Sequence, residues 1–432
     1  MIRRMYERRR WSVFCSVTLG YGMFYLCRVN FSVVKKPMLE EGVLSATEMG
    51  IIGSIMLVVY AAGKLINGFL ADRSNIARFM SLGLLLTALA NLALGFYSGF
   101  FFFVAAWAFS GWFQAHGSAP SVVALSQWFS RRERGTRYGL WSLAHSIGEG
   151  LTFAGTAVLV SALGWRWGFW GPATVCIVAA LILVRTLADR PETYGLPRVA
   201  IYKGEAEEAR DRPMQSLAEV GRLQLEVLRN PAIWLLGLAS ACMYMARYGI
   251  NNWGILYLQE VKGYDLVAAG SVLAASTFTG MFGAASSGWI SDRFFGARRS
   301  VPLLIYGLLE LAALTAFYLV PPGHQLIDSA VMGVFGFALG GLLVYLGGLM
   351  AVDVTAQRAT GAAMGVIGLF SYLGAAVQDV ASGYLLDLGK QVLQGKTIYS
   401  FDSVFSFWIA ASLASLLLAS SVRLVRARSA QG

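Results

Sequence analysis

Two arginines lie inside long apolar stretches of this chain, at matching positions in its two halves. Arg28 falls within residues 11–34 and Arg247 within residues 231–258. Arg28 precedes Asp72 by 44 residues and Arg247 precedes Asp292 by 45, and both aspartates belong to a repeated loop sequence. A charge inside a membrane span is costly and usually functional. Two such charges in an internal repeat predict one central anion-binding site between two half-bundles.

Arginine suits a phosphate because its planar guanidinium offers paired donors to two oxygens and keeps its charge. Arg28 and Arg247 could therefore share one phosphate dianion. The alternative is that each arginine pairs with an acid of another span, and Glu149, Glu310 and Asp379 are available for this. The matching places of the two arginines favour the phosphate site.

Further polar side chains follow helical spacing on otherwise apolar stretches, and we expect these faces to line a central cavity. The predicted ligand-contacting residues are Arg28, Arg247, Lys64, His145, Tyr21, Tyr25, Tyr248, Asn251, Asn252 and Asp379. The tyrosines and asparagines are expected at the organic part of the ligand, whereas the cations are expected at its phosphate.

Three of these residues have a competing interpretation as partners in buried pairs. Lys64 could pair with Asp379 or Glu149, and His145 could pair with Glu149, four residues later in the same helix. The sequence shows no metal-ligand spacing, no phosphate-binding P-loop and no Ser/His/Asp arrangement. We therefore expect no metal and no cofactor, and neither an enzyme nor an ATP-driven pump.

The composition is that of a membrane protein. Of its 432 residues, 56% are hydrophobic and 14% are charged, whereas a soluble domain carries about 25% charged residues. We expect an all-α protein of the lipid bilayer with twelve transmembrane helices of about 20 residues each. The expected spans are residues 11–34, 48–70, 78–96, 101–128, 138–162, 167–187, 231–258, 266–290, 301–320, 328–350, 361–386 and 402–422.

The net charge of +11 would by itself allow a nucleic-acid partner. Lysines and arginines instead collect in the loops and termini that the spans place on one side of the membrane. This positive-inside bias predicts that both termini are cytoplasmic, and it argues against nucleic acid. We expect a multi-pass monomer in a bacterial inner membrane.

The chain divides into two halves with related loops. Residues 188–230 are polar and predict a cytoplasmic linker between six spans in residues 1–187 and six in residues 231–432. The sequence Gly68-Phe-Leu-Ala-Asp72-Arg73 recurs as Gly288-Trp-Ile-Ser-Asp292-Arg293. This pair of loops resembles the signature of the major facilitator superfamily. The resemblance implies two six-helix bundles around a central cavity, with Asp72, Arg73, Asp292 and Arg293 as gating or structural residues.

A second resemblance is more specific. Tyr25-Leu-Cys-Arg28-Val-Asn-Phe in the first span, and segments 60–68, 141–148, 247–253 and 365–374, are similar to motifs of the organophosphate:phosphate antiporter family. The resemblance implies exchange of an organic phosphate, such as glucose-6-phosphate or glycerol-3-phosphate, for inorganic phosphate by alternating access. The phosphate-binding arginines of the family fall on Arg28 and Arg247, its pathway lysine on Lys64 and its histidine on His145.

Three positions depart from the usual pattern of that family. Gly117-Ser-Ala-Pro120 looks closer to sensor-like members, Asn252 stands where the glycerol-3-phosphate type has aspartate, and Glu149 replaces a small residue. One alternative is therefore a transporter-like hexose-phosphate sensor that signals to a membrane histidine kinase. Another is a proton-coupled symporter that uses His145, Glu149 and Asp379.

Overall fold

The computed structural model describes residues 2–204, 225–295, 299–346, 350, 360–393 and 396–429, and these are almost entirely helical. The first half contains α1 (Ile2–Leu26), α2 (Asn30–Glu40), α3 (Ala46–Arg73), α4 (Ile76–Leu94), α5 (Phe100–Gln114), α6 (Ser118–Trp128), α7 (Arg131–Leu151), the π-helix η1 (Thr152–Thr156), α8 (Ala157–Leu163) and α9 (Trp167–Thr186).

The segment after α9 and the second half follow. The elements are the 3-10 turn η2 (Pro191–Tyr194), α10 (Val199–Tyr202), α13 (Pro231–Glu260), α14 (Leu266–Phe295), α15 (Ser300–Leu319), α16 (Gln325–Val344), α18 (Thr360–Leu388), β1 (Lys390–Leu393), β2 (Lys396–Tyr399) and α19 (Asp402–Ser429). The two strands form an antiparallel hairpin.

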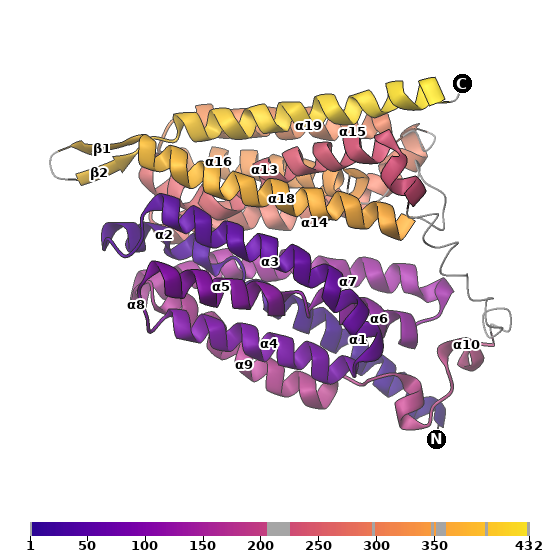
Figure 1. Ribbon diagram of the computed structural model, residues 1–432. Helices are drawn as coiled ribbons and strands as arrows, with labels where there is room; N and C mark the ends of the chain where they lie inside the picture. Colours follow the sequence, from indigo (N-terminus) through magenta and orange to yellow (C-terminus); the bar gives the residue numbers. More distant parts are fainter. Residues whose placement is uncertain are drawn as a thin grey trace.

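The helices of the two halves form two groups that lie side by side (Figure 1). Both chain termini and α10 lie at one end of the helices, and the hairpin of β1 and β2 lies at the other. We call these the terminal end and the hairpin end. This arrangement agrees with an even number of crossings between the termini.

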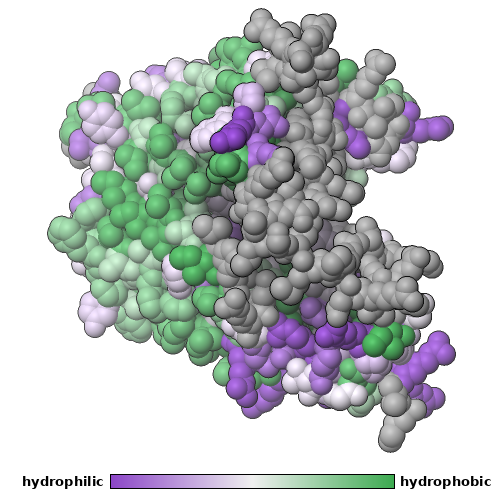
Figure 2. All heavy atoms as spheres, turned by 45° about the vertical axis from the view of Figure 1, so that its right-hand side comes forward, coloured by the Kyte–Doolittle hydropathy of each residue, from purple (hydrophilic) through white to green (hydrophobic). Residues whose placement is uncertain are grey.

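Eleven helical segments within the described residues are long and apolar enough to cross a membrane. The remaining expected span, the fourth along the chain at residues 101–128, is divided by a turn at residues 115–117 into α5 and α6, which are individually too short. With this broken span counted, the described residues contain twelve spans, but the expectation of an unbroken fourth span was wrong. A broad apolar surface covers one side of the molecule (Figure 2), as expected where helices face lipid.

The first span is also broken, and Arg28 lies in the break between α1 and α2. Backbone groups released by such a break must find partners, because lipid offers none. The carbonyl of Cys27 accepts from the side-chain amides of Asn91 in α4, at 3.2 Å, and of Gln114 in α5, at 3.2 Å. Asn30, fully buried at the start of α2, donates to Asn91 Oδ1 at 2.9 Å. Two neighbouring helices therefore stabilise the non-helical backbone that presents Arg28.

The two halves are joined closely at the hairpin end. Gly50 of α3 packs against the backbone of α18, and Gly383 of α18 packs against the backbone of α3, each too closely for any side chain. The backbone N–H of Thr47 donates to Asp387 at 2.7 Å, and Lys36 of α2 forms an ion pair with Glu260 of α13 at 2.9 Å. Small residues and cross-half polar contacts thus seal this end.

The parts of α3 and α18 nearer the terminal end have open space beside them. Lys64 of α3 is exposed to solvent. A side chain added at Gly365 or Gly368 of α18 would meet no described atom within 4 Å. At these positions α3 and α18 are therefore packed less closely than at the hairpin end.

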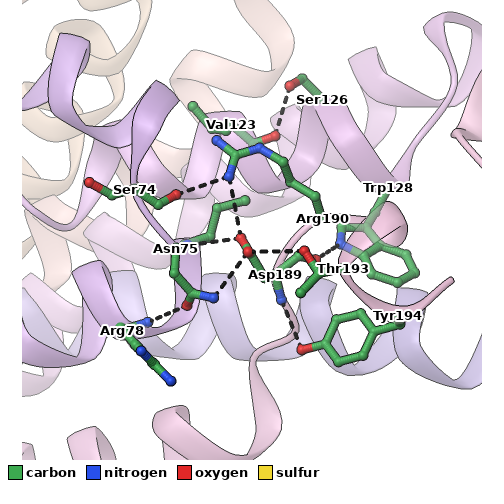
Figure 3. Close-up of polar contacts among 11 residues, drawn as sticks. Ser74, Asn75, Arg78, Val123, Ser126, Trp128, Asp189, Arg190, Thr193 and Tyr194 are labelled. Atoms are coloured by element: carbon green, nitrogen blue, oxygen red, sulfur yellow. Dashed lines mark hydrogen bonds and ion pairs between the residues drawn. The ribbon is translucent and has the colours of Figure 1, made fainter. Parts of the chain in front are cut away.

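A polar cluster around Asp189 ties the segment after α9 to the start of α4 (Figure 3). The Asp189 carboxylate accepts from the backbone N–H of Ile76 at 3.0 Å and from the Asn75 side chain at 3.0 Å. A negative charge at a helix N-terminus is favourable because the first N–H groups lack partners. Arg190 donates to the carbonyl of Ser74 at 3.0 Å. The loop that follows Asp72 and Arg73 is thus held by the end of the first half.

Candidate functional site

Arg28 lies at the centre of the interface between the halves. It is 7% exposed, and its guanidinium carbon lies 3.8 Å from the ring centroid of Tyr60 and 5.0 Å from that of Tyr25. Its Nε and Nη2 atoms have no hydrogen-bond partner among the described residues. Burial of unpaired charged donors is costly unless a ligand satisfies them. Arg28 therefore offers two free donors to an anion.

Arg247 comes from α13 in the other half, and it is 9% exposed. Its Nη2 lies 3.9 Å from Oε2 of Glu149, which belongs to α7. The other carboxylate oxygen of Glu149 accepts from Asn251 at 2.5 Å. Tyr25 and Tyr248 interact electrostatically with both guanidinium groups. The structure therefore brings the two predicted arginines to one site, and it adds an acid beside the second.

Tyrosines from both halves form the wall between the arginines. Tyr60 of α3 lies 5.1 Å from Tyr372 of α18, measured between ring centroids, and Tyr248 of α13 lies 6.4 Å from Tyr372. The hydroxyls of Tyr21 and Tyr25 lie 3.4 Å apart. These three ring pairs are edge-to-face, and such rings can contact a polar organic ligand while their hydroxyl groups donate hydrogen bonds to it.

Lys64 and His145 lie in the same region without the acid partners that the sequence allowed. The ammonium of Lys64 lies 5.5 Å from the Tyr372 ring, and no described carboxylate lies within ion-pair distance of it. His145 contacts the Ser142 carbonyl through Nδ1 and the Ser146 hydroxyl through Nε2. Neither residue is paired with Glu149; Lys64 remains available to a ligand, whereas both ring nitrogens of His145 already have partners.

Asp379 lies in a buried cluster at the edge of the cavity that Arg28 also lines. Its carboxylate accepts from Trp253 Nε1 at 2.7 Å and from Asn252 at 3.0 Å, and Lys35 Nζ lies 3.9 Å away. Asp379 is fully buried and Lys35 is 1% exposed. The Lys35 ammonium also lies 3.3 Å from the centroid of the Trp253 ring. This cluster joins α2 of the first half to α13 and α18 of the second.

The sequence reasoning missed Lys35 and Trp253. Lys35 lies seven residues after Arg28, a spacing of two helical turns that would place both on one face of a continuous helix. That spacing was the available signal. A cavity of about 30 Å³ connects Arg28 with Lys35 and Asp379, and a space of this size can hold one or two water molecules.

Of the four residues expected to act in gating, the structure describes the side chain of Arg293 alone. The side chains of Asp72, Arg73 and Asp292 lie outside the described part of the structure. Arg293 is exposed near the end of α14, which lies at the terminal end. Their gating role therefore stays a prediction.

Comparison with known proteins agrees with this architecture. A family model described as the Major Facilitator Superfamily matches residues 17–378. A membrane sensor protein, UhpC of Salmonella typhimurium, is 33% identical and covers 96% of this chain and 92% of its own. A probable hexose phosphate transport protein of Chlamydia trachomatis is 31% identical and covers 97% and 92%. A glycerol-3-phosphate transporter of Bacillus subtilis is 31% identical and covers 88% and 87%.

A solved structure has the same fold. It is a bacterial homologue of the human lysosomal transporter Spinster, inward-facing and unoccupied. Its TM-score is 0.73 at 16% identity, over 97% of this chain and 96% of that one. The likeness shows the arrangement of helices in a multi-pass membrane protein.

Proposed function

Because this chain belongs to the major facilitator superfamily, we propose that it exchanges an organic phosphate for inorganic phosphate across the membrane by alternating access. The observation that carries the proposal is Arg28, a buried guanidinium with two unpaired donors, in a helix break facing Arg247 of the other half. Relatives named for hexose phosphate and glycerol-3-phosphate transport support the class of ligand.

The charges around the cavity suit a phosphate dianion. Arg28, Arg247, Lys64 and Lys35 are four cations, and Glu149 and Asp379 are two carboxylates, which leaves a formal excess of two positive charges. A phosphate monoester near neutral pH carries between about −1.5 and −2. A ligand of this charge would nearly neutralise the site, whereas a neutral sugar would leave the excess uncompensated.

The placement of the arginines on opposite halves supports alternating access. A phosphate held by Arg28 and Arg247 at once would draw the terminal ends of the halves together. The contacts at the hairpin end, including those of Lys35 with Asp379 and Lys36 with Glu260, would then separate to open that side. The tyrosines Tyr21, Tyr25 and Tyr248 would contact the organic group.

The orientation is part of the proposal. The terminal end, with the linker of residues 188–230, faces the cytoplasm, and the hairpin end faces outward. Residues 1–187 and 231–432 then form the two bundles that rock against each other in a bacterial inner membrane. Asp72, Arg73, Asp292 and Arg293 would hold helix ends together when the cytoplasmic side closes.

A sensor is the second candidate function. The UhpC relative, named a membrane sensor protein, covers nearly the whole chain. In this version the same site binds a hexose phosphate, and the change between states is transmitted to a membrane histidine kinase instead of completing transport.

Reconstitution separates the two functions. Purified protein in liposomes loaded with inorganic phosphate is given labelled phosphate outside, followed by competition with glucose-6-phosphate and glycerol-3-phosphate. Uptake that is inhibited by one of these esters supports the transporter and identifies the ester. Tight ester binding without any uptake supports the sensor. Absence of both binding and uptake in folded protein would refute the phosphate site.

A further inference from the structure

The carboxylate of Glu149 occupies a position that joins the two halves inside the candidate site. Glu149 belongs to α7 of the first half and is 5% exposed. Both of its oxygens face α13 of the second half, where Oε1 accepts from Asn251 at 2.5 Å and Oε2 lies 3.9 Å from Arg247 Nη2. Arg28 also interacts with it electrostatically. A single side chain therefore links the halves as an anion would.

The chemistry of this contact resembles that expected of a bound phosphate oxygen. A carboxylate offers acceptor oxygens to a guanidinium and to an amide, as a phosphate does. At 3.9 Å the contact with Arg247 is longer than the 2.7–2.9 Å of a tight charge-assisted hydrogen bond. Glu149 thus neutralises Arg247 without a close hydrogen bond to it, while Arg28 keeps two free donors.

We propose that Glu149 is a built-in counter-anion that takes the place of the ligand in the empty protein. This inference rests on the proposed function. Without Glu149, an empty site would hold two arginines whose repulsion prevents closure. Each reorientation of the protein would then require a bound anion. With Glu149 bridging to Arg247 and Asn251, the empty protein can close and reorient.

Two consequences follow from that role. The first is that coupling between influx and efflux is loose, so that phosphate can leave one side without a return ligand. The second is that an incoming phosphate must either displace the Glu149 carboxylate or bind beside it. Repulsion between the two negative groups then weakens phosphate binding. Inorganic phosphate should be affected more than an ester, because the ester gains further contacts with the tyrosines.

Two variants test these consequences. Glu149→Gln removes the charge and keeps an oxygen that can accept from Asn251. Glu310→Gln is the matched control, because Glu310 is a buried acid of α15 that contacts Ser412 of α19, away from the site. Binding of inorganic phosphate and of glucose-6-phosphate is measured by calorimetry on purified protein. Efflux of labelled phosphate from loaded liposomes is measured with and without external phosphate.

The expected result has two parts. Glu149→Gln binds inorganic phosphate at least about tenfold more tightly than the native protein, because a nearby like charge is gone. Its efflux into phosphate-free medium falls at least about tenfold relative to exchange, whereas Glu310→Gln keeps the native ratio. Native protein releases phosphate into phosphate-free medium at a rate comparable with exchange.

Each of three other outcomes would refute either the role of Glu149 or the proposed function. If native protein and both variants bind and exchange phosphate with the same affinity and the same ratio of efflux to exchange, the role of Glu149 is wrong and the phosphate site stands. If neither native protein nor Glu149→Gln binds any phosphate while both remain folded, the proposed function itself is wrong. If ligands bind without transport, an unchanged affinity in Glu149→Gln also refutes the inference, because the charge effect on binding does not depend on transport.

Discussion

We expect the ion pair of Lys35 and Asp379 to stabilise the closed hairpin end. Replacing Asp379 with Asn keeps an acceptor for Trp253 but leaves the Lys35 ammonium buried and unpaired. Loss of one partner of a buried pair costs about 3–5 kcal/mol. The cost applies to the closed arrangement, since separation of α2 from α18 would expose Lys35 to water. At about 1.4 kcal/mol per factor of ten, the ratio of open to closed molecules should rise by two powers of ten or more.

The distance between two spin labels on opposite halves measures this ratio. Glu40 in α2 and Val392 in β1 are both exposed at the hairpin end, so labels there should not disturb packing. They are introduced as cysteines after the four native cysteines have been removed. The native background should show mainly the short distance of the closed hairpin end. Asp379→Asn should add a longer distance as the major population.

A double variant separates the charge effect from damage to packing. Lys35→Met together with Asp379→Asn removes both charges and keeps an acceptor oxygen for Trp253 and Asn252, and removal of both charges of a buried pair is often neutral. The double variant should therefore return most molecules to the short distance, although each single variant shifts them away from it. An unchanged distance distribution in Asp379→Asn would refute the reasoning. So would a double variant whose effect equals the sum of the two single effects, because independent sites add.

Three further predictions concern single positions. Arg28→Lys should lower phosphate exchange in liposomes by about ten- to a hundredfold, because a lysine ammonium cannot give paired donors to two phosphate oxygens; native exchange would contradict this. Asp189→Ala should lower the free energy of unfolding by about 2 kcal/mol, because the Asp189 carboxylate loses its hydrogen bonds at the start of α4. An unchanged melting temperature would argue against a stabilising role for these hydrogen bonds. Partial burial acts to raise the pKa of Glu133, but hydrogen bonds from Arg10 and Lys203 outweigh it and lower the pKa below its usual value. Glu133 therefore stabilises the fold above the ordinary carboxyl pKa and loses this effect as the pH falls through its lowered value, so Glu133→Gln should be about 0.5 kcal/mol less stable at pH 7 and equal to the native protein at the most acid pH. A difference that persists there would contradict the assignment.

Features that repeat or persist along the chain could be predicted from the sequence. Each membrane span requires only about 20 apolar residues in a row, so the number and places of the spans follow from local composition. The correspondence of Arg28 with Arg247 follows from the repeated distance to Asp72 and Asp292. The structure confirms the all-helical fold, and it places both arginines at one interface.

The breaks in the spans could not be predicted in the same way. Residues 27–29, where the first span is interrupted, contain neither glycine nor proline, which are the usual local signals for a break. The carbonyl freed there accepts from Asn91 and Gln114, which lie in two other helices. Whether those amides reach it depends on the packing of three helices, and no pattern within the first span records that.

The buried charges show the same contrast, because their location in the membrane could be predicted from the sequence but their partners could not. The sequence by itself determined that Glu149, Asp379 and the two arginines would lie within a membrane-embedded bundle, because hydropathy is a local property. Only the tertiary structure decided that Glu149 faces Arg247 and Asn251, and that Asp379 faces Lys35, Asn252 and Trp253. Asn251 is 102 residues from Glu149, and at such separations the pairing depends on how two bundles dock. Helical spacing shows which side chains share a face, but the opposing face comes from the other half of the chain.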